Sequence, residues 1–193
     1  MTDEKFKELF SKHGPSQNQF ELKNLMDWLE VAMPNPKTIV EVGVFRGGTF
    51  TFWRHILDRE GLLIGVDLND RGYMYSIEQE YSQDKNTKFI VGLKSNEPMC
   101  VKKVKDELKG RPIDILFLDA GHRYEDVRGE FLNYGPLVRP GGLIIFHDIV
   151  GPELIKESEI WMFWRYQKFN LKAQGSIEFF GKDNPCGIGV IVK

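Results

Sequence analysis

The sequence predicts an α/β protein with a doubly wound, mostly parallel seven-stranded sheet between two layers of helices. Three observations predict it. Short apolar runs rich in β-branched residues alternate with longer segments of helical spacing. The first of these runs leads into a glycine-rich turn, and later runs end in acidic residues. The last two runs, 176–180 and 188–192, are joined by a polar turn with Asn184 and Pro185, which suits an antiparallel hairpin at the sheet edge.

Length and composition indicate a single globular domain over residues 1–193, with residues 1–36 as an N-terminal helical extension. Of the 193 residues, 41% are hydrophobic and 28% are charged, and the net charge is −2. This balance argues against a broad nucleic-acid surface, and no apolar run is long enough to span a membrane. Cys100 and Cys186 are far apart, so we expect free thiols in a reducing compartment. We expect a cytoplasmic protein without nucleic-acid or membrane partners that could form a homo-oligomer.

The N-terminal extension contains two predicted helices, 3–12 and 18–32, each with apolar residues spaced for one face. The sequence Gly14-Pro15-Ser16 separates them, and Pro34 and Pro36 end the second. Two roles are open for these helices. They could pack at an edge of the sheet, or they could fold over the carboxyl ends of the strands as a lid.

The first predicted strand, 38–42, leads into a turn containing Gly43, Gly47 and Gly48, and then into a helix. Such a turn places free N–H groups at the carboxyl edge of the sheet, where α/β proteins bind nucleotide-like ligands. Phe45 stands where a dinucleotide fingerprint requires glycine, and no lysine follows Gly48 as in a P-loop. The turn therefore favours a different nucleotide-like ligand.

The remaining elements alternate in the same way. The second strand ends at Asp67, where a carboxylate can accept hydrogen bonds from both ribose hydroxyls of a nucleoside. A helix or loop over 71–84 follows. The later predicted elements are a strand at 88–92, a helix at 97–109, a strand at 113–118, a helix at 123–134, a turn at 140–142, a strand at 143–146 and a helix at 153–169.

Four ionisable residues follow the fourth and fifth strands: Asp119, His122, His147 and Asp148. Because adjacent parallel strands bring their carboxyl ends together, we expect these side chains to meet at one rim of the sheet. Asp119, His147 and Asp148 could hold a divalent cation, with Mg²⁺ or Mn²⁺ favoured by the oxygen ligands. The cation would polarise a substrate hydroxyl, and His122 could accept its proton. Each residue taken singly could equally be a structural cap or turn residue.

Glu41 on the first strand, followed by Gly-x-x-x-Gly-Gly, resembles the first motif of class I S-adenosylmethionine (SAM) dependent methyltransferases, which have a Rossmann-like fold. In that family the glycine turn cradles the methionine part of SAM, and the segment after the third strand often contacts adenine. The resemblance implies that the residues binding SAM are Glu41, Gly43, Phe45, Gly47, Gly48, Asp67, Ser95 and Asp119.

A second resemblance covers the chemical end of the sheet. Asp-x-x-His-x-Tyr at 119–124, Arg-Pro-Gly-Gly at 139–142 and the His147-Asp148 strand end look like a subgroup of these methyltransferases. The subgroup includes macrolide-sugar and rhamnosyl O-methyltransferases and the "cephalosporin hydroxylase"-like proteins, and the likeness runs from about 38 to 149. It implies metal ligation by the two acids and a base role for His122. Relatives often carry an acid at position 147.

These expectations together predict a SAM-dependent O-methyltransferase acting on a small hydroxylated molecule, with a sugar as one candidate. A non-catalytic SAM- or nucleoside-binding protein is the first alternative. An NAD-dependent oxidoreductase is the second, and Phe45 argues against it. RNA methylation is disfavoured because no basic aromatic stripe is present.

Overall fold

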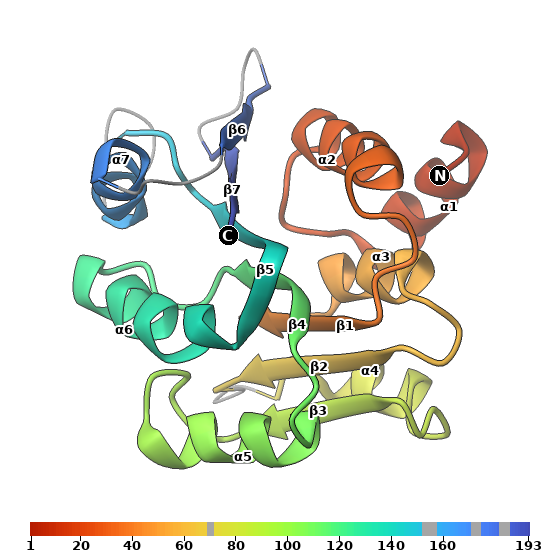
Figure 1. Ribbon diagram of the computed structural model, residues 1–193. Coiled ribbons are helices and arrows are strands. Elements are labelled where there is room, and N and C mark those ends of the chain that lie inside the picture. The colour runs from red at the N-terminus through yellow and green to blue at the C-terminus, as the bar shows by residue number, and fades with distance from the viewer. Residues whose placement is uncertain (69–71, 152–157, 171–174, 182–185) are drawn as a thin grey trace.

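The computed structural model describes the chain except residues 69–71, 152–157, 171–174 and 182–185 (Figure 1). The described helices are α1 (Asp3–His13), α2 (Gln19–Ala32), α3 (Gly48–Ile56), α4 (Tyr75–Glu80), α5 (Pro98–Leu108), α6 (Tyr124–Tyr134), the short 3₁₀ helix η1 (Gly135–Leu137) and α7 (Ile160–Asn170). The described strands are β1 (Thr38–Val42), β2 (Leu62–Asp67), β3 (Thr87–Val91), β4 (Ile113–Leu118), β5 (Val138–His147), β6 (Ser176–Phe179) and β7 (Ile188–Val192).

The strands form one seven-stranded sheet in the order β3-β2-β1-β4-β5-β7-β6. The pairs from β3 to β5 are all parallel, while β7 pairs antiparallel with both β5 and β6. The strand order reverses between β1 and β4, which places their carboxyl ends at the topological switch point of the sheet. The predicted fold class, including the antiparallel C-terminal hairpin, is confirmed.

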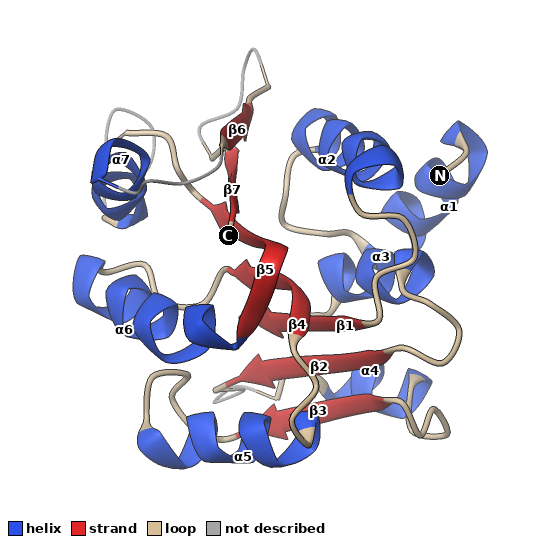
Figure 2. Ribbon diagram, viewed as in Figure 1, coloured by secondary structure: helices blue, strands red, loops and turns tan. Residues whose placement is uncertain are grey.

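Helices cover both faces of the sheet, which gives three layers (Figure 2). Alternate residues of β1 face opposite layers. Val40 and Val42 belong to the apolar cluster under α5, α6 and α7, whereas Ile39 belongs to the cluster under the other helices. A strand buried on both faces must be apolar at consecutive positions, as the sequence of β1 is. The core therefore lies on both sides of the parallel strands.

The N-terminal extension packs on the sheet face that α3 covers. The Phe6 ring of α1 lies 5.2 Å from the Phe52 ring of α3, and the Trp28 ring of α2 lies 6.1 Å from Phe179 of β6. Asn18 caps α2 in a capping box whose partner is Glu21. The extension is thus tied to the fold by apolar contacts at its two helices. No helix among the described residues is long and apolar enough to cross a bilayer.

Two predicted elements differ from the structure. Residues 140–142, predicted as a turn before the fifth strand, lie inside β5, which begins at Val138. The strand continues past Pro140 because its register shifts against β4 and because Gly141 adopts a positive φ of 72°. The predicted helix over 153–169 is described as helical only from Ile160, and its start lies outside the described residues. The predicted turn at Asn184 and Pro185 also lies outside them.

Candidate functional site

The glycines of the turn after β1 are required mainly by close backbone approaches. A Cβ on Gly43, whose φ is 97°, would overlap the Asp119 carbonyl at the end of β4. A Cβ on Gly48 would overlap the Pro15 backbone, and one on Gly47 would overlap the Ile77 side chain. Gly43 and Gly48 line a cavity at the carboxyl edge of the sheet, called the main cavity below, whereas Gly47 faces Ile77. The turn is therefore pressed between the end of β4 and the N-terminal extension.

Phe45 adopts the left-handed conformation (φ 52°), which is strained for a bulky residue. Its backbone N–H donates to Asp67 Oδ2 at 2.7 Å, so the turn is joined to the end of β2. Its half-exposed ring lies 5.0 Å from the Tyr73 ring, and the Arg46 guanidinium lies 5.2 Å from Phe45 and 5.3 Å from Tyr73. The strained turn thus presents an aromatic pair and a cation beside the cavity.

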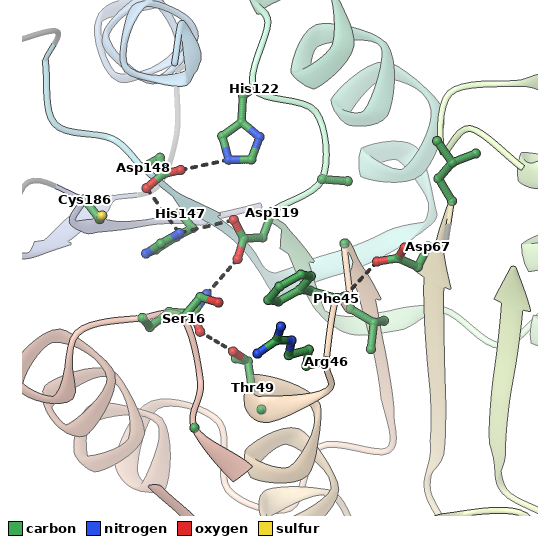
Figure 3. A pocket seen from close by; sticks show the side chains of 17 residues that line it. Ser16, Phe45, Arg46, Thr49, Asp67, Asp119, His122, His147, Asp148 and Cys186 are labelled. Atoms are coloured by element: carbon green, nitrogen blue, oxygen red, sulfur yellow. Dashed lines mark hydrogen bonds and ion pairs between the residues drawn. The ribbon is translucent and has the colours of Figure 1, made fainter. Parts of the chain in front are cut away.

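One cavity of about 460 Å³ lies at the carboxyl ends of β1, β2, β4 and β5 (Figure 3). Its walls carry Gly14, Ser16, Gln17, Gly43, Val44, Phe45, Arg46, Gly48, Thr49, Asp67, Leu68, Asp119, Ala120, His122, His147, Asp148 and Cys186. A second cavity of about 210 Å³ adjoins it and shares Asp67, Leu68 and Ala120. The two hollows share a wall that includes Asp67.

Besides Gly47, two of the predicted binding residues, Glu41 and Ser95, lie outside the main cavity. Glu41 is fully buried on β1, its Oε2 has no hydrogen-bond partner among the described residues, and burial together with the negative charge of Asp119 raises its pKa. Ser95 lines the second cavity and donates to Glu130 Oε1 at 2.5 Å. Burial raises the pKa of Glu130 to about 7. These two residues can therefore act on a ligand in the main cavity only through neighbours.

The four rim residues come together as their positions on β4 and β5 predict. His122 Nε2 lies 3.0 Å from Asp148 Oδ2, and His147 Nδ1 lies 3.2 Å from Asp119 Oδ1 and 3.3 Å from Asp148 Oδ1. The other ring nitrogen of His147, Nε2, lies 3.2 Å from Glu21 Oε1 of α2. The buried imidazole of His147 is therefore surrounded by three carboxylates.

These contacts shift the pKa values of the rim. Burial alone would lower the pKa of His147, but the charge of Asp119 and hydrogen bonds to Asp119 and Glu21 outweigh it and raise the pKa well above its ordinary value. The hydrogen bond to Asp148 likewise raises the pKa of His122. Burial would raise the pKa of Asp148, but the hydrogen bond from His122 and the charge of His147 lower it. The rim is thus a network in which acids and imidazoles contact one another directly.

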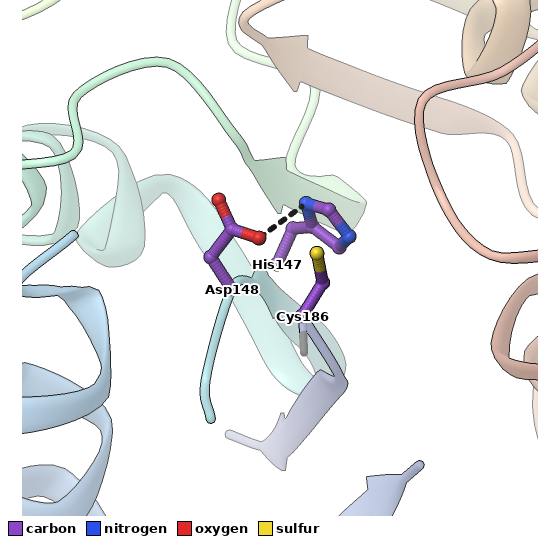
Figure 4. Close-up of side chains that lie close together, drawn as sticks. All are labelled: His147, Asp148 and Cys186. Atoms are coloured by element: carbon purple, nitrogen blue, oxygen red, sulfur yellow. Dashed lines mark ion pairs between the residues drawn. The ribbon is translucent and has the colours of Figure 1, made fainter. Parts of the chain in front are cut away.

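Two groups of potential metal ligands lie in this network, each with donor atoms within 4.8 Å of one another. One is Asp119, His122 and Asp148; the other is His147, Asp148 and Cys186 (Figure 4). The predicted trio of Asp119, His147 and Asp148 is divided between these groups. Burial and the charge of Asp148 raise the pKa of the Cys186 thiol.

Sequence reasoning missed several cavity residues. Gln17 lines the cavity and contacts Asp119, 102 positions away, while Glu21 contacts the cavity residue His147, 126 positions away; no local pattern in the N-terminal extension marks either contact. Cys186 precedes β7 and reaches the rim because β7 pairs with β5. Arg46 lies within the turn motif, where a cation beside an aromatic residue is a usable signal.

Comparison with known proteins places the chain in a family. A family model described as a methyltransferase domain matches residues 40–149, which run from within β1 to just past β5 and include the rim residues. The chain belongs to the methyltransferase domain family. This methyltransferase domain is 31% identical over 120 residues to demethylmacrocin O-methyltransferase of Streptomyces fradiae, a match covering 58% of the chain and 27% of that relative. It therefore spans about a quarter of the length of that curated relative.

Solved structures show that the methyltransferase domain has the fold of class I SAM-dependent methyltransferases. The O-methyltransferase TomG from Streptomyces achromogenes, in complex with SAM, superposes with a TM-score of 0.71 at 17% identity, covering 100% of this chain and 90% of that one. MycE methyltransferase from the mycinamycin biosynthetic pathway, in complex with Mg, SAH (S-adenosylhomocysteine) and mycinamycin VI, gives 0.64 at 18% identity, covering 97% and 54%. The predicted family is confirmed.

Proposed function

We propose that this domain is a SAM-dependent O-methyltransferase that methylates a hydroxyl of a small molecule. The observation that carries the proposal is a single cavity in which the glycine turn, Asp67 and the rim of Asp119, His122 and Asp148 face the same space. Methyl transfer needs a nucleoside-binding wall and a proton-accepting wall side by side, because the two reactants must be held in contact. Residues 1–193 supply both walls as one domain.

The shape of the two adjoining cavities fits SAM. Asp67 lies where they meet, and its carboxylate can accept hydrogen bonds from ribose hydroxyls. Adenine would then occupy the smaller cavity, whose polar wall includes Ser95, Asn96 and Asp126. The amino-acid part would lie over Gly43, Gly48 and Thr49 in the larger one, where Arg46 can pair with a carboxylate.

SAM supplies a methyl group bound to a sulfonium, which a nucleophilic oxygen can attack in line. The residues at the rim would accept the proton that the acceptor hydroxyl loses. Asp148 holds His122 through Nε2, which leaves Nδ1 as the basic atom of the ring. We assign His122 as the base that accepts the proton of the acceptor hydroxyl, and Asp148 as the residue that orients it. Asp119 would lie beside both reactants.

A sugar is the acceptor class that suits this rim best. The cavity wall on this side carries carboxylates, imidazoles and a thiol, which offer many hydrogen-bond partners for a molecule with several hydroxyl groups. The Phe45 ring, which lines the same cavity, provides an apolar surface for the C–H face of a sugar ring. The match to demethylmacrocin O-methyltransferase supports transfer of the methyl group to an oxygen.

A divalent cation at the rim is a second proposal, supported by the donor set of Asp119, His122 and Asp148 within 4.8 Å. These atoms fit Mg²⁺ or Mn²⁺, which would polarise the acceptor hydroxyl. The two roles of His122 exclude each other, since an imidazole bound to a cation through Nε2 carries its proton on Nδ1. His147 as a ligand would require the loss of a proton from a ring placed among three carboxylates.

Calorimetry tests the function against its alternatives. We expect binding of S-adenosylhomocysteine and no binding of NADH, because Phe45 fills the place that a pyrophosphate needs. An oxidoreductase would give the opposite result. Consumption of SAM with a panel of monosaccharides, glycosides and catechols then separates an enzyme from a non-catalytic SAM-binding protein, which would bind but never turn over.

A further inference from the structure

The segment between α1 and α2 forms a wall of the main cavity. Gly14, Ser16 and Gln17 all line it, and the Pro15 backbone lies so close to Gly48 that a Cβ there would overlap it. This segment belongs to the N-terminal extension and precedes the part of the chain that the family model matches. The extension therefore reaches the candidate active site directly.

Gln17 makes the decisive contacts of this segment. Its side chain is buried, at 3% exposure, and both ends of its amide are used. Nε2 donates to Asp119 Oδ2 at 2.6 Å, and Oε1 accepts a hydrogen bond from the Thr49 hydroxyl. Asp119 and Thr49 stand on opposite sides of this connection in Figure 3. One side chain thus links the end of β4 to the first turn of α3.

The other oxygen of Asp119 is also held. Oδ1 lies 3.2 Å from His147 Nδ1, and His147 is fixed in turn by Glu21 of α2. Glu21 is itself fully buried, and its Oε2 accepts from the Gly187 N–H at 2.9 Å. Gln17 and the chain from Glu21 to His147 therefore determine the orientation of the Asp119 carboxylate from two sides.

We propose that Gln17 is a positioning residue, which holds Asp119 in the orientation that receives the amino-acid end of the bound nucleoside; this rests on the proposed SAM-binding function. An apolar side chain such as leucine at position 17 could fill the space that Gln17 fills, but it would make no hydrogen bonds. An amide whose donor meets a cavity carboxylate and whose acceptor meets a cavity hydroxyl does more, because it sets the direction of both partners. Thr49 completes the arrangement by orienting the amide.

Calorimetry with two probes tests the proposal. S-Adenosylhomocysteine carries the amino-acid group, whereas 5′-methylthioadenosine lacks it. Gln17→Ala should weaken binding of the first about tenfold, as expected for the loss of a hydrogen bond to a charged group, and leave binding of the second within about twofold. Gln19→Ala is the matched control, since it removes an exposed amide two positions away and should change neither affinity. Equal weakening of both probes would show a merely structural role and overturn the proposal.

The order of two substitutions separates positioning from space filling. Gln17→Glu keeps the size of the side chain but places a carboxylate against Asp119, so it should weaken S-adenosylhomocysteine binding more than Gln17→Ala does. A side chain that only fills space would give the reverse order, which contradicts the proposal. In an Asp119→Asn background the effect of Gln17→Ala should shrink to below about twofold, because the partner through which it acts is changed. A persistent tenfold effect would also contradict it.

Thr49→Val keeps the test valid if the Gln17 variants do not fold. It preserves shape, leaves Gln17 Oε1 without its donor, and should weaken S-adenosylhomocysteine binding by a few-fold; wild-type affinity would count against the proposal. The binding data also distinguish an error in the proposed SAM-dependent function from an error in the role of Gln17. If the wild-type domain binds no S-adenosylhomocysteine, the proposed function is wrong; if it binds and Gln17→Ala binds equally well, only the role of Gln17 is wrong.

Discussion

The backbone N–H of Phe45 donates to Asp67 Oδ2 at 2.7 Å, which joins the strained turn after β1 to the acidic end of β2. This contact fixes the orientation of the Asp67 carboxylate, and Asp67 lines both cavities. The same relationship explains why a bulky residue tolerates a positive φ at position 45. Its backbone is held by a charge-assisted hydrogen bond.

The first prediction concerns Asp67. Asp67→Ala should weaken S-adenosylhomocysteine binding about 10- to 100-fold, because the ribose hydroxyls lose a charged acceptor. Calorimetry measures it, with Asp106→Ala as control, since Asp106 is exposed on α5 and paired with Lys102. Unchanged affinity would remove Asp67 from the ribose.

His122 is the subject of the second prediction. His122→Ala should lower turnover of SAM about 10²- to 10⁴-fold, the usual range for a general base, while S-adenosylhomocysteine affinity stays within twofold. Steady-state kinetics with the acceptor found in the panel, together with calorimetry, separates the two quantities. Turnover at the wild-type rate would dismiss the base assignment.

The metal proposal gives the third prediction. Mn²⁺ titrated into the domain should lose its free-ion electron paramagnetic resonance signal, and Asp119→Ala should restore that signal. His122→Ala distinguishes the two uses of the imidazole, because a ligand role predicts weaker Mn²⁺ binding and a base role predicts unchanged binding. A free-ion signal that persists with the wild-type domain refutes the site.

Glu130 gives a pH-dependent prediction. Burial raises its pKa from 4.5 to about 7, so between these values the folded domain holds a proton that the unfolded chain releases. Stability should therefore fall as pH rises from about 4.5 to 7, by up to about 3 kcal/mol in total. Glu130→Gln, which keeps the acceptor for Ser95, should match the wild type at pH 4.5 and exceed its melting temperature at pH 8. Glu125→Gln on the same helix is exposed and should show no such gain.

Gly48 supplies the fifth prediction. Gly48→Ala places a Cβ against the Pro15 backbone, and such overpacking costs about 1–3 kcal/mol. For a chain of this size the melting temperature should drop by about 3–10 °C. Gly175→Ala, whose added Cβ meets no atom of the described residues within 4 Å, is the control. A stable Gly48→Ala domain would mean that the extension does not press on the turn.

The strands and their ends were predictable because their signals are local. The run from Ile39 to Val42 and the acids at 67 and 119 are visible within a few residues, and strand alternation then gives their common edge. The cluster of Asp119, His122, His147 and Asp148 followed from that edge alone.

The rest depends on contacts between distant parts of the chain. The partners of His147 and Asp119 in the extension are separated from them by 126 and 102 positions, and nothing near Gln17 or Glu21 marks them. The start of β5 was missed because Pro140 and Gly141 look like a turn, whereas β5 pairs with β4 on either side of them and the Gly141 N–H donates to the Lys193 carbonyl at 2.6 Å.

One of the three carboxylates around His147, that of Glu21, lies outside the family-matched residues 40–149, whereas Asp119 and Asp148 lie within them. Glu21 comes from the second helix and is anchored by the Gly187 amide just before the last strand. A fragment trimmed to residues 40–149 would retain His147 but lose both Glu21 and the Gly187 amide that holds it. The family-matched residues 40–149 therefore do not define the smallest functional fragment, and any shortened version for expression or engineering must keep the segments that contain Glu21 and Gly187.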